Sequence, residues 1–211
     1  MDNLDSTADV IREEMELKNA ARDKAYQRSR QLISVCARSI RAIHREEWEA
    51  AENLIIDARN AAEKLVADVE EYPSLYHAGY TQDALKEYVE ANLTYALIRN
   101  QPLATPLELG VEGSTWLNGL AEAATEMRRR ILDIMRHGHS DESERLLDVM
   151  DQIYSTLLTF DFNDSITGGL RRRTDTVRAV LERTRGDVTN SLRQSELEKA
   201  LAALEARLKD G

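Results

Sequence analysis

TQDALKEYVEANLTYALIRN, residues 81–100, is the stretch that decides the fold class. Wound as an α-helix of about 3.6 residues per turn, it carries apolar side chains around most of its circumference. A helix that is apolar nearly all round is buried among other elements. The apolar members are Ala84, Leu85, Tyr88, Val89, Ala91, Leu93, Tyr95, Ala96 and Ile98. A narrow polar stripe of Asp83, Lys86, Glu87, Glu90 and Thr94 remains.

The rest of the chain continues this helical pattern on both sides of the central stretch. Apolar residues recur at helical spacing, and proline or glycine falls mostly between the periodic segments. A loop is predicted over 102–115, Thr81, Ser140 and Asn163 are the expected N-caps, and Gly186 is expected to end a helix. We therefore predict a single all-α domain over residues 1–211, a seven-helix bundle or α-α superhelix. The predicted helices are 9–45, 46–70, 81–100, 116–136, 140–160, 163–185 and 188–208.

Composition supports this class and limits the possible partners. Aromatic residues make up 5% of the chain and there are three prolines, which argues against extended sheet. Asp and Glu number 38 against 28 Lys and Arg, a formal net charge of −10. A uniformly basic coat for nucleic acid is excluded, because the field of the whole molecule repels phosphate. Any nucleic-acid site requires arginines concentrated away from the acids.

The single cysteine and the absence of long apolar runs suggest a location. Cys36 has no partner for an internal disulfide and lies in an apolar stripe, so it is expected to be buried. No apolar run approaches the roughly 18 residues that a membrane span requires. The acidic N-terminus, MDNLDSTADV, lacks the apolar segment of a signal peptide. We expect a soluble, cytoplasmic protein that does not associate with membranes.

Two groups of carboxylates are candidate ligands for a cation. Glu87 and Glu90 stand one turn apart on the enclosed central helix, where buried carboxylates require an arginine, a shared proton or a divalent cation. The competing interpretation is a solvated stripe with an intrahelical pair of Asp83 and Lys86. Glu122 and Glu126 are likewise one turn apart, and in a monomer a solvated face explains them equally well.

Other metal and nucleotide sites are not indicated by the sequence. No Glu-x-x-His occurs, which excludes the di-iron carboxylate motif, and one cysteine excludes thiolate zinc. Gly168 and Gly169 lack the spacing of a phosphate-binding loop. In an oligomer, the two pairs of glutamates would together supply the hard oxygen ligands that Mg²⁺ or Mn²⁺ prefers.

Four stretches of the chain, in order, resemble the translin family, especially its archaeal members related to translin-associated factor X. AYQRSRQLISVCARSIRAIHR (25–45) resembles the long N-terminal helix of the family, and EYVEA (87–91) its third-helix block. WLNGLAEAATEMRRR (116–130) resembles the fourth-helix block, and FDFNDSITGGLRRRTDTVRAVLERTRGDVT (160–189) the archaeal C-terminal signature. Each motif is weak alone, and four in order are a strong match.

The resemblance implies a seven-helix protein that assembles into a homo-octameric shell around RNA or single-stranded DNA. In the factor-X branch this shell is a metal-dependent endoribonuclease. Its acidic motifs fall at Glu87, Glu90 and Glu122 as catalytic residues, with Glu126 as a further ligand for Mg or Mn. Relatives more typically carry Asp at the position of Glu122, and a carboxylate displaced by about 1 Å can cost a hundredfold in rate.

The same resemblance suggests where RNA phosphates bind. Arginines of the first helix are the expected contacts: Arg28, Arg38, Arg41 and Arg45, with the 128–130 cluster as a further set. Two alternatives stay open. One is a shell that binds RNA or single-stranded DNA without cutting it, as translin does, and the other is a structural helical bundle whose acidic stripes face solvent.

Overall fold

The computed structural model describes residues 3–209, and over this range it contains nine α-helices and no strand. The all-α class is confirmed. The helices are α1 (Leu4–His44), α2 (Trp48–Val69), α3 (Pro73–Tyr76), α4 (Gly79–Ile98), α5 (Pro106–Leu109), α6 (Gly113–Met135), α7 (Asp141–Leu157), α8 (Asp164–Thr167) and α9 (Leu170–Lys209).

The helices belong to two compact units. The first comprises the chain up to Asn92 together with Ala104–Trp116, so it contains α1, α2, α3, α5 and most of α4. The second comprises Leu93–Leu103 and the chain from Leu117 onward, which contains most of α6 and all of α7, α8 and α9. Each unit has its own buried apolar residues.

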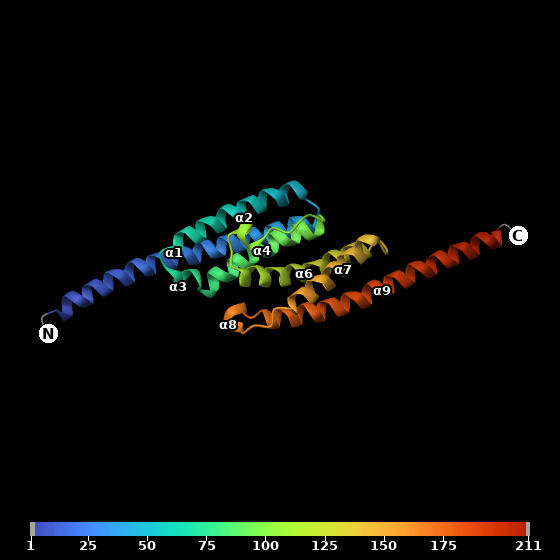
Figure 1. Ribbon diagram of the computed structural model, residues 1–211. Helices are drawn as coiled ribbons and strands as arrows, with labels where there is room; N and C mark the ends of the chain where they lie inside the picture. The colour runs from blue at the N-terminus through green and yellow to red at the C-terminus, as the bar shows by residue number, and fades with distance from the viewer. Residues whose placement is uncertain (1–2, 210–211) are drawn as a thin grey trace. The chain divides into compact units, whose positions relative to one another are not determined.

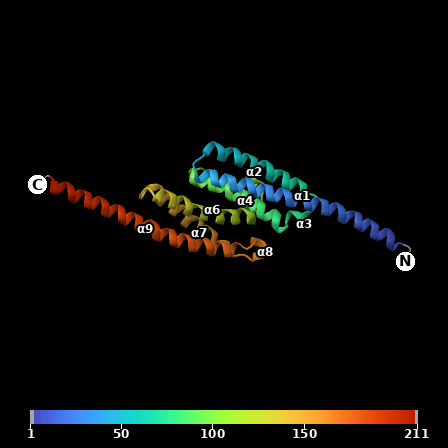
Figure 2. The same ribbon diagram turned by 180° about the vertical axis from the view of Figure 1, so that it is seen from behind.

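A long helical hairpin organises the first unit. The later part of α1 and the whole of α2 lie side by side and run in opposite directions (Figures 1 and 2). Leu32, Ile43 and Leu65 are fully buried in this unit. The connection bends at Glu46, whose φ of 60° is unusual for a residue with a side chain. It allows the Glu47 N–H to donate to the Ala42 carbonyl at 3.0 Å, which satisfies one of the last carbonyls of α1.

An ion-pair cluster joins the two helices of the hairpin. Lys24 Nζ lies 2.8 Å from Asp68 Oδ1, and Arg28 pairs with the other carboxylate oxygen. Burial of Asp68 opposes its charged form, but the hydrogen bonds from Lys24 and Arg28 outweigh this effect and hold its pKa below the usual 3.8. The side chain of Asp68 is 14% exposed, and solvent screens its contact with Arg28 (30% exposed) less than its contact with Lys24 (57% exposed).

We expect this cluster to make stability depend on pH in the acid range. Because the folded-state pKa of Asp68 is lowered, its contribution is complete above the unfolded value and is lost as the pH falls through the folded value. Asp68→Asn should lower the unfolding free energy at pH 7 by about 1–3 kcal/mol and flatten the loss of stability below about pH 4. Urea unfolding at pH 7 and pH 3 measures both effects. An unchanged acid response in the variant would contradict the assignment.

The connection predicted as a loop over 102–115 contains a short helix. Thr105 Oγ1 accepts from the Glu108 N–H, the Glu108 side chain accepts from the Thr105 N–H at 2.7 Å, and Pro106 occupies the first helical position. This capping box with an N-terminal proline initiates α5 locally. The prediction that Thr81 caps the central helix is wrong, because α4 begins at Gly79 and Thr81 instead donates to the Leu75 carbonyl at 2.8 Å.

Within the second unit, α9 contacts both α7 and α8. The core of the second unit includes the fully buried residues Leu146, Met150 and Val177. The predicted caps are confirmed here: Ser140 Oγ accepts from the Ser143 N–H at the start of α7, and Asn163 Oδ1 accepts from the Ser165 N–H at the start of α8.

The predicted division of the C-terminal region is wrong in two places. The helix opened by Asn163 is only α8, which ends at Gly168 in the left-handed conformation with φ 61°. The next helix, α9, then runs through Gly186 without a break. Glycine inside a helix costs only about 1 kcal/mol relative to alanine, and the buried neighbours Leu181, Thr184 and Val188 tie both sides of Gly186 to the core.

A substitution at this position should therefore stabilise the protein. Gly186→Ala should raise the unfolding free energy by up to about 1 kcal/mol, since an added Cβ meets no atom within 4 Å. Gly168→Ala is the matched control, because its positive φ strains any side chain and its Cβ would lie 3.4 Å from Asn118 Nδ2. Denaturant unfolding should move the two variants in opposite directions.

The two longest helices, α1 and α9, each extend beyond the helix that packs beside them. The first part of α1 extends beyond α2, and the last part of α9 extends beyond α7 (Figures 1 and 2). Exposed apolar residues occur on both, among them Ile11 and Met15 on α1 and Leu197 and Leu204 on α9. None of the helices in residues 3–209 combines the length and apolarity needed to cross a bilayer.

Candidate metal centre and nucleic-acid interface

The polar stripe of α4 is enclosed rather than solvated. Glu90 is 7% exposed and Lys86 is 9% exposed, while Thr94 is fully buried. Lys86 Nζ lies 3.2 Å from Glu87 Oε1, whereas the solvated interpretation pairs the lysine with Asp83. Of the five stripe residues only Asp83 is exposed. Helical spacing thus places two carboxylates one turn apart in a largely buried setting.

Glu122 is fixed on α6 by a partner that the sequence did not indicate. Arg173, in the first turn of α9, donates from Nε to Glu122 Oε1 at 3.0 Å. The Nη1 of the same arginine donates to Asn118 Oδ1 at 3.1 Å. Both Glu122 and Arg173 are about a quarter exposed, so the pair is partly shielded from water. Glu122 and Arg173 lie 51 positions apart in the sequence and on different helices, so helical periodicity could not predict this contact.

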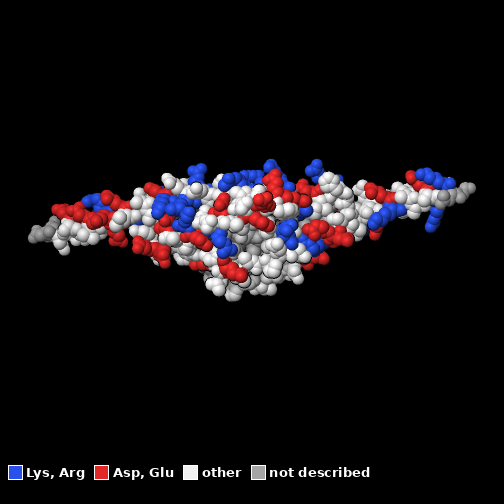
Figure 3. Space-filling view, turned by 90° about the horizontal axis from the view of Figure 1, so that it is seen from above, with Lys and Arg blue, Asp and Glu red and all other residues white. Residues whose placement is uncertain are grey.

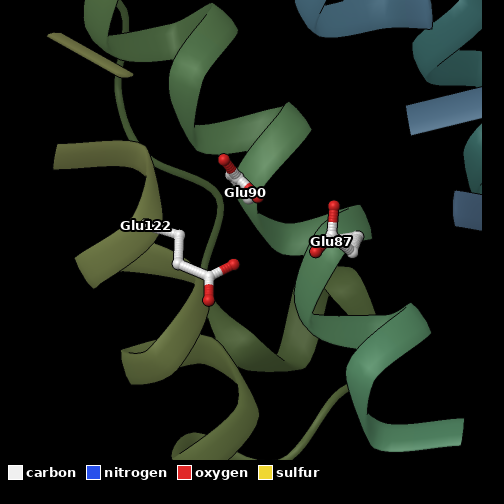
Figure 4. Close-up of side chains that lie close together, drawn as sticks. All are labelled: Glu87, Glu90 and Glu122. Carbon is white, nitrogen blue, oxygen red and sulfur yellow. The ribbon is translucent and has the colours of Figure 1, made fainter. Parts of the chain in front are cut away.

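Glu87, Glu90 and Glu122 form one group of potential ligands. Each offers a carboxylate oxygen, and these oxygens all lie within 4.8 Å of one another. Figure 4 shows Glu87 and Glu90 on successive turns of α4, and Glu122 extending from α6. Three carboxylates so close repel one another unless cations balance them. The group has the chemistry to hold a hard divalent cation. Glu126, the fourth predicted ligand, is not a member of it.

The negative charges of Glu87 and Glu90 on α4 affect the pKa of the buried Cys36 thiol. Cys36 is fully buried, as predicted. Burial, followed by the charges of Glu87 and Glu90, raises its pKa to about 12. The thiol is therefore neutral near pH 7 and adds no negative charge beside the two carboxylates.

The predicted arginines of α1 fall into two groups. Arg38, Arg41 and Arg45 are exposed and lie within about 60° of one another around the helix. Among the described residues, none of these three forms an ion pair. Arg28 points about 100° away from this face and pairs with Asp68 of α2. Arg30, which the sequence analysis did not single out, is exposed and lies on the same side as the first three.

Charge on the surface is mixed rather than segregated into one basic patch. Figure 3 shows Lys and Arg interspersed with Asp and Glu over the face that it draws. The arginine face of α1, defined as Arg30, Arg38, Arg41 and Arg45, is therefore a local feature. Its exposed, unpaired guanidinium groups suit contacts with phosphate oxygens.

Comparison with known proteins adds independent observations. No protein-family model matches the chain. It is 26% identical over 192 residues to an uncharacterized protein of Methanocaldococcus jannaschii, across 90% of this chain and 85% of that protein. AfC3PO, solved as a complex with duplex RNA, is 32% identical with a TM-score of 0.83, across 89% of this chain and 97% of its own.

Two further solved structures have the same fold. AfC3PO determined in a second crystal structure is again 32% identical, with a TM-score of 0.82 and 98% of its chain covered. The apo form of NeC3PO is 22% identical with a TM-score of 0.77, across 90% of this chain and 98% of its own, a likeness of fold alone. The nucleic acid in the AfC3PO complex is duplex RNA, whereas the sequence analysis expected RNA or single-stranded DNA.

Proposed function

The chain belongs to the translin family of C3PO proteins, and on this premise we propose that it binds RNA and cleaves it in a metal-dependent endonucleolytic reaction. The observation that carries the proposal is the group of three glutamates whose carboxylate oxygens lie within 4.8 Å of one another. Similarity to a protein that binds duplex RNA supports the substrate class. The reaction is phosphodiester hydrolysis.

The proposed ligands of the metal are Glu87, Glu90 and Glu122, and the family resemblance alone adds Glu126, which lies outside that group, as a fourth. Carboxylate oxygens are the hard donors that Mg²⁺ and Mn²⁺ prefer, so the residues present fit either ion. Lys86 pairs with Glu87 and Arg173 pairs with Glu122, so cations already lie beside two of these carboxylates.

The catalytic roles follow from these positions. A bound divalent cation would polarise the scissile phosphate and lower the pKa of a water molecule for attack on phosphorus. Glu90, the most buried of the three, supplies a ligand that is itself shielded from bulk water. Lys86 keeps a positive charge beside Glu87, which limits repulsion between that carboxylate and the incoming phosphate.

RNA recognition is assigned to the arginine face of α1, and assembly into a homo-octamer that encloses the RNA is part of the proposal. Exposed guanidinium groups bind phosphate oxygens with paired hydrogen bonds and carry no sequence preference. Enclosure would explain how a chain of net charge −10 binds a polyanion, because the acids can face outward.

The proposal is tested with purified protein and end-labelled RNA, both duplex and single-stranded, in Mn²⁺, in Mg²⁺ and in EDTA. We expect internal cleavage products with the divalent cations and intact RNA in EDTA. Binding without cleavage would leave the RNA-binding function and overturn the nuclease, and no binding would overturn both. Light scattering tests assembly against eight times the 23.9 kDa mass of one chain.

Removing the arginine face should weaken RNA binding in a salt-dependent way. We expect the triple variant Arg38→Ala, Arg41→Ala, Arg45→Ala to reduce the slope of log affinity against log salt by about one for each phosphate that the variant no longer binds. Fluorescence anisotropy at several salt concentrations measures this slope. The matched control removes three exposed cations from the C-terminal part of α9 (Arg193, Arg207 and Lys209). Equal effects in both triple variants would assign the weaker binding to net charge alone.

A further inference from the structure

Glu122 is the end of a relay of hydrogen bonds that starts at the turn between α8 and α9. Asn118 Nδ2 donates to the Thr167 carbonyl at 2.7 Å. Arg173 Nη1 donates to Asn118 Oδ1 at 3.1 Å and to the Gly168 carbonyl at 3.4 Å. Arg173 Nε then donates to Glu122 Oε1 at 3.0 Å. All five residues belong to the second unit.

The turn itself is shaped for this relay. Gly168 and Gly169 both have positive φ, 61° and 81°, a conformation that glycine adopts without strain. A Cβ at Gly168 would lie 3.4 Å from Asn118 Nδ2, and one at Gly169 would lie 3.8 Å from Arg173 Nη1. The glycine pair, which matches no phosphate-binding motif, thus lies beside Asn118 and Arg173, and Arg173 is the residue that contacts Glu122.

Arg173 lies at a helix end where a positive charge is unfavourable. It occupies the first turn of α9, where the helix dipole disfavours a cation by about 0.3–1 kcal/mol. Its hydrogen bonds to one carboxylate, one amide and one backbone carbonyl offset that penalty. A guanidinium held by three acceptors has little freedom to rotate, and neither has the carboxylate that it holds.

We propose that Arg173 is a positioning residue that orients Glu122 for a divalent cation, an inference that rests on the metal site of the proposed function. The guanidinium donates to Oε1 of the carboxylate that the proposed function assigns to the metal. Partners of this kind in metal sites orient the ligand and preserve its charge, and their loss typically weakens metal binding by about 10–100-fold. A lysine at the same position retains the charge but lacks the planar fork that reaches both Glu122 and Asn118.

The test is Mn²⁺ binding by isothermal titration calorimetry on the full-length chain, without RNA. We expect Arg173→Ala to weaken Mn²⁺ binding about 10–100-fold and Arg173→Lys to recover part of the loss. Asn118→Ala keeps the charge of Arg173 and removes its anchor, and it should weaken binding by a factor between those of the other two. The control is Arg178→Ala, which removes an exposed pair with Glu182 on the same helix and should leave binding unchanged.

The outcomes separate this inference from the proposed function. If Arg173→Ala binds Mn²⁺ as tightly as wild type, or more tightly, while Glu122→Gln loses binding, the positioning role is wrong and the metal site stands. If wild type itself binds no Mn²⁺, both are wrong. Thermal unfolding in EDTA shows whether each variant is folded, and a weakened Asn118→Ala alongside an unaffected Arg178→Ala cannot arise from loss of charge.

Discussion

Replacing Glu90 with glutamine should lower Mn²⁺-dependent RNA cleavage by more than about 100-fold, which is beyond the range for loss of a partner that only orients a ligand. Glutamine has the size and shape of the glutamate but no charge, so it binds a divalent cation weakly. Glu90 is 7% exposed, and water cannot easily replace the missing ligand. RNA binding should persist within about threefold, because the arginine face of α1 is untouched.

Labelled-RNA cleavage under single-turnover conditions gives the rate, and anisotropy in EDTA gives the affinity for RNA. Asp83→Asn is the matched control, since it removes an exposed carboxylate from the same stripe of α4. Full activity in Glu90→Gln, or an equal loss in Asp83→Asn, would contradict the assignment. A raised Tm in the Glu90 variant is compatible with it, because neutralising one of three clustered carboxylates relieves repulsion.

Truncating Leu32 should have the largest effect on stability. Leu32 is fully buried on the face of α1 that packs in the first unit, so Leu32→Ala removes buried methyl groups and leaves a cavity. The expected loss is about 2–5 kcal/mol, or a fall in Tm of about 4–20 °C for a chain of this length. Leu17→Ala is the control on the same helix, where the leucine is 61% exposed, and it should lie within about 0.5 kcal/mol of wild type.

Differential scanning calorimetry compares the two leucine variants under the same buffer conditions. Similar losses for both would mean that the exposed end of α1 is covered by another surface in solution. A small loss for Leu32→Ala alone would mean that the core of the first unit relaxes to fill the cavity.

Periodicity predicted the helices because burial of an apolar face requires that spacing along the chain. It failed where a local signal competes with it. Gly186 predicts the end of a helix, but α9 continues through it because buried residues on both sides of the glycine pack against the core. The capping box at Thr105 and Glu108 was overlooked inside a loop rich in proline and glycine. That residues 1–211 form one domain stays a prediction.

The site divides in the same way. Glu87 and Glu90 could be paired from the sequence because they lie on one helix, but the sequence left open whether their stripe is enclosed or solvated. The approach of Glu122 depends on tertiary structure, and its inclusion in the sequence analysis came from the family resemblance. Arg173 and Asn118 had no sequence signal, because their partners are separated from them along the chain by 49 to 55 residues.

The buried thiol has a practical consequence for spectroscopy. With a pKa of about 12 and no exposed surface, Cys36 is ionised in about one molecule in ten thousand at pH 8, and alkylating reagents react only with the thiolate. Maleimide dyes and spin labels should therefore not react with Cys36, so the native cysteine does not have to be replaced before labelling. One cysteine introduced on the exposed surface of α1 and another on α9 would accept a donor and an acceptor dye, and energy transfer between them would test whether added RNA changes their separation.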